Sequence, residues 1–360
     1  AIPNPPQSST IIRQRGGGVK KIIPHLTTKP QKGKIGAVIW EVFVMARTGL
    51  VYHPIYLEHE THFHPENRQR LSRTVEHLKS VGLWERLHHI EARRATVEEV
   101  ALVHKKSYIE EVEKFCAAGG GHLDMDTVVG PRSYEAALFA VGGLLAASDA
   151  VINGEVANAC CLVRPPGHHA MPDRAMGFCV FNNVAIAAKY LQKTHNIQKV
   201  AIIDWDVHHG NGTQHVFWRD GSVFYLSMHR WPFYPGTGSD RERGEGVGEG
   251  TTLNLPFSAF DHRERVLENF KSALEEVEKF APDFVLISAG YDAYELDPIG
   301  GLGLKIEDYR QLTDWVCELA KRTAGGRVIS TLEGGYNLEA LPQMIEGHIR
   351  GLLAASEGAD

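Results

Sequence analysis

The sequence predicts an α/β protein in which a doubly wound, mainly parallel sheet carries helices on both faces. Two observations predict this fold: short runs that are apolar almost throughout, and helical patterns between several of them. Strands covered on both faces are continuous apolar runs, and strand–helix alternation is typical of parallel sheets. The 360 residues, 43% of them apolar, are enough for one large core.

These patterns divide the chain into elements. Strands are expected at 49–53, 159–163, 199–204, 222–227, 283–289 and 327–333. Helices are expected at 133–152, 183–195, 262–280, 306–324 and 338–353. Because no internal repeat or second boundary is found, residues 45–360 are expected to form a single domain. The carboxyl ends of its parallel strands share one edge, and binding sites are expected there.

Residues 1–44 differ in composition from the rest of the chain. They are rich in Pro, Gly and basic residues, and Glu41 is their one acidic residue. This composition is typical of a tail or linker. We expect the native protein to start near Met45, the first methionine. The expected location is the cytoplasm, with organelle targeting by this basic segment as the alternative.

Charge, cysteines and hydropathy limit the partners. The chain has a net charge of −6 and residues 1–44 one of +6, which leaves −12 for the remainder and disfavours direct nucleic-acid binding. Five cysteines without a CxxC pair argue against disulfides and a cysteine zinc site. No apolar run approaches the roughly 18–20 residues of a membrane helix, so no membrane partner is expected. The oligomeric state is left open.

The first candidate site follows the strand at 199–204. Asp204, Asp206 and His208 alternate, so in an extended chain all three point the same way. Two carboxylates at close range repel each other, and a bound cation relieves that repulsion. A lone aspartate at a strand end is most often a helix cap. Three aligned ligands followed by Gly-Asn-Gly favour a metal site instead.

Asp292 follows the strand at 283–289, where a third ligand would lie. Three protein ligands with an open fourth position are the arrangement of catalytic metal sites. We therefore expect one divalent ion, with zinc preferred, although an oxygen-rich set also suits Fe(II) or Co(II). Asp297 precedes Pro298 and is interpreted as a turn residue.

The third motif is the histidine pair in RPPGHHA, residues 164–170. On a Pro-Gly loop, His168 and His169 can both face a cavity, and beside a metal such a pair suits proton transfer. Asp204 and Asn211 are the candidate acceptors that orient them. The pair His88-His89 lies in a helix-like context and is interpreted as a surface pair.

The fourth motif, LEGGYN, follows the last long strand. Its paired glycines allow close backbone approach and would present the Tyr336 hydroxyl to the site, where a phenol can donate to an oxyanion. Alone, this signal is weak because Gly-Gly-Tyr turns are common.

Taken together, the motifs resemble those of the histone deacetylase superfamily, which has the arginase/deacetylase fold. They occur in the family's order over roughly residues 50–350, and the combination is far more specific than any single motif. The version is most similar to class II members and to the bacterial histone deacetylase-like amidohydrolases. The matching segments are RPPGHHA, MGFCVFNN, DWDVHHGNGTQ, MHRWPFYPGTG, NLPF, SAGYDA and LEGGYN.

The resemblance implies a role for each matching residue. The zinc ligands would be Asp206, His208 and Asp292. The proton-transfer pair would be His168 and His169, with Tyr336 polarising the acyl carbonyl. A tunnel for the lysyl chain would be lined by Gly177, Phe178, Tyr234 and Ile299. The rim carboxylate that binds substrate backbone would be Asp126, with Asp124 as its rival.

The resemblance also implies structural potassium. One ion would be held by Asp204, by the Ser227 hydroxyl and by the backbone oxygens of Asp206, His208 and Met228. A second ion would lie near Phe217, Asp220 and Val223.

Three positions sort the subtypes of this family. Asn211 stands where class I members have Asp, which fits class II. Tyr336 stands where weakly active class IIa members have His, so competent catalysis is expected. Ile299 stands where polyamine-preferring relatives have Glu, and an apolar residue suits a neutral acyl-lysine better than a charged polyamine.

The expected activity is removal of acetyl or longer acyl groups from Nε-acyl-lysine in proteins or peptides by metal-activated water. An acetylpolyamine or small-amide deacetylase is the first alternative. A binuclear manganese ureohydrolase of the arginase type would need further Asp or His ligands. A non-catalytic acyl-lysine-binding module would not need the histidine pair and Tyr336. The number of metal ions per chain distinguishes the ureohydrolase, and a turnover assay distinguishes the binding module.

Overall fold

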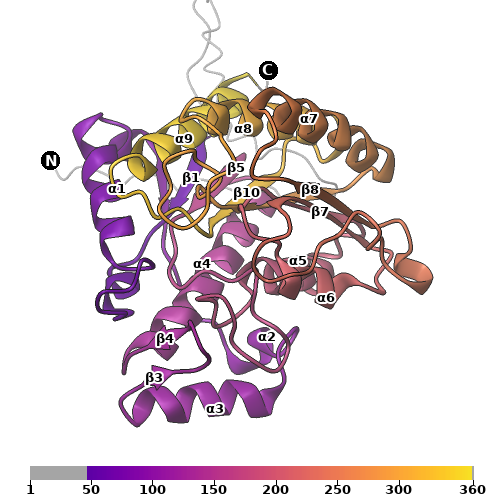
Figure 1. The fold of residues 1–360 in the computed structure, drawn as a ribbon. Coiled ribbons are helices and arrows are strands. Elements are labelled where there is room, and N and C mark those ends of the chain that lie inside the picture. Colours follow the sequence, from indigo (N-terminus) through magenta and orange to yellow (C-terminus); the bar gives the residue numbers. More distant parts are fainter. Residues whose placement is uncertain (1–46, 359–360) are drawn as a thin grey trace, which may run out of the picture. The chain divides into compact units, whose positions relative to one another are not determined.

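The computed structural model describes residues 47–358, so the predicted N-terminal extension, residues 1–44, lies outside the described part. The described chain contains an eight-stranded sheet in the order β2-β1-β5-β10-β9-β6-β7-β8, and every neighbouring pair is parallel (Figure 1). Helices α1, α7, α8 and α9 lie on one face, and α4, α5 and α6 lie on the other. The predicted doubly wound α/β fold is confirmed.

The large sheet consists of β1 (Thr48–Val51), β2 (His88–Ile90), β5 (Asn158–Cys161), β6 (Val200–Asp204), β7 (Val223–Arg230), β8 (Thr252–Phe257), β9 (Phe284–Ala289) and β10 (Val328–Leu332). A small antiparallel pair consists of β3 (Gly121–His122) and β4 (Val128–Val129). The helices are α1 (Gln69–Ser80), α2 (Val97–Val100), α3 (Lys106–Ala117), α4 (Ser133–Ile152), α5 (Asn183–His195), α6 (Asn211–Phe217), α7 (Arg263–Phe280), α8 (Asp308–Thr323) and α9 (Leu341–Glu357).

All six predicted strands are present, and the helices predicted at 133–152 and 183–195 coincide with α4 and α5. The patterns did not predict four further strands, β2, β3, β4 and β8, or four further helices, α1, α2, α3 and α6. Strand β8 lies at the sheet edge and contains Pro256, which weakens a strand pattern. The helix-like context assigned to His88 and His89 is wrong, because both residues lie in β2, the opposite edge strand.

Helix α4 is an exception to the expectation that no segment is long and apolar enough to span a membrane. Its best 18-residue window has a mean hydropathy of 1.6, so by length and composition it could cross a membrane. Within the protein, 72% of that window is buried, and the helix packs against α5 and β5. Gly142 permits a close approach, since a Cβ there would lie 2.0 Å from the carbonyl oxygen of Arg93. An apolar surface on all sides is thus used inside the core.

The central strands bring the four predicted motifs to one edge. Strands β5, β10, β9 and β6 are consecutive neighbours, and each is followed directly by one motif. In the register, Asp204 at the end of β6 pairs with Ser288 of β9 and with Ser227 of β7. The loops that leave these strands therefore start at nearly the same height and meet above the sheet edge.

Candidate active site

Three metal-competent side chains, Asp206, His208 and Asp292, form a compact group that we call the aspartate cluster. One possible ligand atom of each lies within 4.8 Å of the others. The Nδ1 atom of His208 is 3.0 Å from Oδ1 of Asp206 and 3.1 Å from Oδ2 of Asp292. Because each residue is at most 7% exposed, these atoms converge on a point below the surface.

Two glycines make room for the carboxylates of this cluster. A Cβ on Gly290 would lie 2.1 Å from Oδ2 of Asp206, and one on Gly334 would lie 2.1 Å from Oδ2 of Asp292. Among residues 47–358, the ion-pair partners of both aspartates are histidines, with no Lys or Arg. Two buried carboxylates with an imidazole, and no basic side chain to neutralise them, fit a divalent metal such as zinc.

The pKa values of the cluster reflect this excess of negative charge. Burial raises the pKa of Asp292 to about 7, and the neighbouring Asp206 carboxylate adds to the rise. Burial acts to lower the pKa of His208, but its hydrogen bonds to the two carboxylates prevail and raise that pKa to about 10. The cluster therefore favours a positive charge between its carboxylates, from a proton or from a metal ion.

The extended geometry predicted for residues 204–208 is not found. Strand β6 ends at Asp204, and the chain then bends so that Oδ1 of Asp206 accepts from the His208 amide at 2.9 Å. Asp204 points away from the cluster. Its Oδ2 lies 3.0 Å from Nδ1 of His168 and accepts a hydrogen bond from the Tyr225 hydroxyl at 3.0 Å. Asp204 thus occupies the place expected of the acceptor that orients His168.

His168 and His169 lie side by side, with ring centroids 4.0 Å apart, but their pKa values diverge. Burial acts to lower the pKa of His168, yet the carboxylates of Asp204 and Asp206 prevail and raise it to about 10. Burial lowers the pKa of His169 well below its ordinary value, and the adjacent His168 and His208 lower it further. The pair therefore combines one readily protonated imidazole with one that stays neutral.

Asn211 fixes the tautomer of His169. Its Oδ1 lies 2.8 Å from Nδ1 of His169, while its Nδ2 faces the sulfurs of Met171 and Met176. An amide oxygen only accepts, so Nδ1 of His169 carries the proton in this arrangement. The Nε2 atom is then the nitrogen that can accept a proton.

Tyr336 is held from two sides. Its backbone amide donates to Oδ2 of Asp297 at 2.7 Å, and the Arg70 guanidinium lies 5.0 Å from its ring centre. Asp297 is the predicted turn residue, since Oδ1 accepts from the amides of Ile299 and Gly300, but it also anchors the Tyr336 loop. Burial raises the pKa of Tyr336 well above its ordinary value, so the phenol stays protonated and can donate.

A cavity of about 230 Å³ adjoins the cluster. It contains every predicted tunnel residue, and its lining is Asp126, His169, Gly177, Phe178, His208, Phe233, Tyr234, Ile299 and Tyr336. The sequence reasoning missed Phe233, whose ring stacks on His208 at 5.2 Å. A larger hollow of about 630 Å³ near Trp218 contains neither the cluster nor the histidine pair, so size alone does not locate the site.

The structure separates the two rival rim carboxylates. Oδ1 of Asp126 accepts from the Gly177 amide at 3.1 Å, and Asp126 lines the cavity. Asp124 instead closes the local turn by accepting from the amides of Asp126 and Thr127 at 3.0 and 2.7 Å. Of the two, Asp126 lies where a rim residue is expected.

The predicted potassium ligands fall into two places. Asp204 and Ser227 are register partners on β6 and β7, with Met228 next along β7, so the first set is brought together. At the second set, the Lys189 ammonium lies 2.5 Å from Oδ2 of Asp220 and 5.0 Å from the ring centre of Phe217. A lysine thus already neutralises Asp220.

A second group of buried charges was not predicted, and we call it the arginine cluster: Glu66, Arg70 and Arg164. Oε1 of Glu66 accepts from Nε of Arg164 at 2.5 Å and from Nη1 of Arg70 at 3.1 Å. Arg70 also donates to the carbonyl oxygens of Glu333 and Gly335, in the loop that carries Tyr336. Arg164 belongs to the RPPGHHA motif, but its carboxylate partner lies 98 residues away and left no local signal.

Known proteins are similar to this chain in both sequence and fold. The histone deacetylase domain family matches residues 64–352. A probable deacetylase of Archaeoglobus fulgidus is 40% identical over 318 residues, which cover 87% of each chain. The histone deacetylase-like amidohydrolase of Pseudomonas aeruginosa is 39% identical over 280 residues, 77% of this chain and 73% of that protein. The crystal structure of the HDA15 HD domain superposes with a TM-score of 0.81 at 35% identity, covering 87% of this chain and 90% of that chain.

Proposed function

The chain belongs to the histone deacetylase family and is a hydrolase of the deacetylase type, and from that premise we propose that it removes acetyl groups from Nε-acetyl-lysine in peptides or proteins with the aid of one zinc ion. The observation that carries the proposal is a juxtaposition of groups. His208 of the aspartate cluster, His169 of the histidine pair and Tyr336 all line one cavity. An amide placed there would meet the metal ligands, a neutral base and a phenol donor together.

The aspartate cluster would hold the zinc ion. When bound, zinc acts as a Lewis acid toward the amide carbonyl and lowers the pKa of water toward neutrality. Fe(II) and Co(II) suit the same donors. A potassium ion beside it would use Asp204, Ser227 and backbone oxygens of that region.

The protein's own side chains would move the protons. His169 is neutral, and its Nε2 would accept a proton from the water that attacks the acyl carbon. His168, held by Asp204, would keep a positive charge beside it and help return a proton to the departing lysine amine. The Tyr336 phenol would donate to the acyl oxygen as negative charge develops there.

The cavity walls would select the substrate. Phe178 and Tyr234 would flank the apolar methylene chain of the acyl-lysine, and Ile299 would offer no charge to a polyamine. The Asp126 carboxylate at the rim would accept a backbone N–H of a peptide, but it would also accept from a polyamine ammonium, so the discrimination rests on the uncharged wall at Ile299. Acyl-lysine in a peptide therefore fits these groups better than an acetylated polyamine.

A substrate panel tests the proposal. Zinc-reconstituted protein is assayed with acetyl-lysine peptides, longer acyl-lysines and acetylpolyamines, with Asp292→Ala as the inactive control. We expect kcat/KM for the acetyl peptide to exceed that for acetylpolyamines by about 10-fold or more, the scale at which apolar pockets discriminate. Faster turnover of acetylpolyamines would show that the substrate is an acetylpolyamine rather than acetyl-lysine. If no amide were hydrolysed, the whole proposal would be contradicted.

A further inference from the structure

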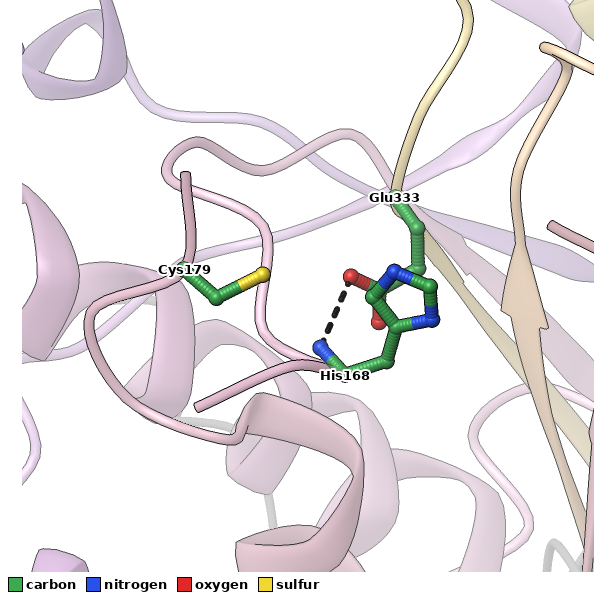
Figure 2. A group of neighbouring side chains, drawn as sticks. All are labelled: His168, Cys179 and Glu333. Atoms are coloured by element: carbon green, nitrogen blue, oxygen red, sulfur yellow. Dashed lines mark hydrogen bonds between the residues drawn. The ribbon is translucent and has the colours of Figure 1, made fainter. Parts of the chain in front are cut away.

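Glu333 is a buried carboxylate that the mechanism above does not use. It follows β10 directly and is 0% exposed. Its Oε2 accepts from two consecutive backbone amides, Gly167 at 2.7 Å and His168 at 3.2 Å, and its Oε1 accepts from the Ser288 hydroxyl at 3.1 Å. In Figure 2 the hydrogen bond from the backbone nitrogen of His168 to the Glu333 carboxylate is drawn as a dashed line. One side chain therefore joins the end of β10, the histidine loop and β9.

The backbone around Glu333 is fixed just as firmly. Its amide donates to the carbonyl of Ala289 at 3.0 Å, and its own carbonyl accepts from Arg70. The next amide, that of Gly334, donates to Oδ2 of Asp206 at 2.8 Å. Tyr336 follows two residues later. Glu333 is thus the point at which the loop carrying Tyr336 is attached to the loop carrying His168.

The group drawn in Figure 2 also has the residue types of a metal site. Possible ligand atoms of His168, Cys179 and Glu333 lie within 4.8 Å of one another, and the Cys179 thiol points toward the carboxylate. The ligand atoms are already engaged, however. Both Glu333 oxygens accept hydrogen bonds, and Nδ1 of His168 faces Asp204. Burial also raises the pKa of the Cys179 thiol well above its ordinary value, which disfavours the thiolate that a metal requires.

We propose that Glu333 is a positioning residue: by accepting the amides of Gly167 and His168 from the end of β10, it sets the spacing between His168 and Tyr336. The inference rests on the proposed function, in which these two groups act on the same amide. Displacement of a catalytic group by about 1 Å can lower a rate about 100-fold, so such an attachment matters for turnover.

Two substitutions of Glu333 distinguish the effect of side-chain length from the effect of its negative charge. In Glu333→Gln the amide oxygen can accept from both backbone N–H groups, and the Ser288 hydroxyl can turn to accept from the new NH2. This variant keeps the hydrogen bonds and loses the charge. In Glu333→Asp the charge remains, but the carboxylate retracts by roughly 1.5 Å, one C–C bond, and cannot keep all three partners.

The proposal predicts that the Gln variant is the better enzyme. With zinc-loaded full-length protein, we expect kcat of Glu333→Gln within about 5-fold of the parent and that of Glu333→Asp lowered by about 10–100-fold, the usual effect of an orienting residue. KM and zinc content are expected to stay unchanged in both. Glu339→Asp, the same change at an exposed glutamate of the next turn, is the matched control and is expected to match the parent.

A second measurement does not depend on activity. Hydrogen exchange of the peptide that covers residues 165–169 is expected to be faster in Glu333→Asp than in Glu333→Gln or the parent. Equal exchange in the three proteins, or an Asp variant as active as the Gln variant, would overturn the proposal. An inactive parent that still shows the exchange difference would instead contradict the deacetylase proposal and leave the attachment supported.

Discussion

The two groups of buried charge next to the cavity differ in how their charges are balanced. In the arginine cluster, Glu66 is paired with two guanidinium groups, and Arg164 also donates to the carbonyl oxygens of Tyr56 and His59. Burial acts to raise the pKa of Glu66, but Arg164 prevails and holds that pKa well below its usual range. The aspartate cluster has two carboxylates and one imidazole, and burial raises the pKa of Asp292 to about 7.

This difference separates structure from function. In the arginine cluster each charged group has its partners inside the protein: the carboxylate lies between two guanidinium groups, whose other donors reach backbone carbonyl oxygens, so the cluster needs nothing from outside. In the aspartate cluster two carboxylates share one imidazole, and such like charges cost free energy until a cation arrives. We therefore expect the arginine cluster to govern stability and the aspartate cluster to govern metal binding and activity.

The sharpest test of this contrast removes one carboxylate from the aspartate cluster. If the cluster holds zinc as proposed, Asp292→Asn removes one of its ligands, and the loss of several kcal/mol of transition-state stabilisation is expected to lower kcat/KM about 1000-fold or more. The metal-free variant is expected to melt no lower than the metal-free parent, because repulsion with Asp206 is relieved. Zinc titration followed by thermal denaturation and an activity assay measures both effects. A metal-free variant that melts well below the parent would show that the cluster is also structural.

The reverse experiment removes the carboxylate of the arginine cluster. Glu66→Gln leaves two buried guanidinium groups without an anion, and breaking such a pair typically costs about 3–5 kcal/mol. We expect the free energy of unfolding to fall by that amount with and without a chelator, as measured by denaturant titration. Glu245→Gln, which removes the exposed ion pair with Arg219, is the control and should leave the unfolding curve unchanged. A Glu66→Gln protein as stable as the parent would show that the arginine cluster does not govern stability.

Tyr336 lies between the two clusters, since Arg70 covers its ring and its side chain lines the cavity. If it acts on the substrate rather than on the fold, Tyr336→Phe lowers kcat by about 100–1000-fold, as expected for loss of an oxyanion donor. Zinc content and melting temperature are expected to stay at the parental values. Near-normal turnover by the variant would remove Tyr336 from the mechanism.

The smallest expected effect concerns the addition of a charge. Asn211→Asp would place a carboxylate against Nδ1 of His169, and a nearby anion favours the charged imidazolium. The pKa of His169, now well below its ordinary value because of burial and two neighbouring imidazoles, would rise. Since the base must be neutral to accept a proton, the acidic limb of the kcat/KM profile should move to higher pH by about 1 pH unit. An unmoved limb would mean that another group limits activity on the acid side.

A structural feature could be predicted from the sequence where the residues that determine it are close together in the chain. The strand runs and the helices α4 and α5 were predictable because their apolar patterns are continuous, and the motifs after β5, β6, β9 and β10 were predictable because parallel strands end at one edge. The orientation of Asp204 was not predictable from alternation. It depends on the bend after β6 and on His168, which comes from another loop.

The missed residues have partners distant in sequence. Arg70 bonds to carbonyl oxygens 263 and 265 residues away, and Ser288 donates to Glu333 from 45 residues away. A single charged residue in a loop gives no sign that it will be buried. Helix α4 was placed correctly, but its hydropathy was underestimated; an apolar surface on all sides serves a core and a membrane equally well, so composition alone does not say which one the helix occupies.

The arrangement of the aspartate cluster also bears on how the protein matures. His208 and Asp292 are 84 residues apart in the chain, and they come together only when β6 and β9 pair. Gly334, which gives both carboxylates their space, follows β10, the last strand. Parallel pairing over such separations forms late, because the loops must close before the contacts stabilise them. We therefore expect a newly made chain to complete its sheet first and to acquire its metal afterwards, so that metal supply limits how much enzyme becomes active rather than how much of it folds.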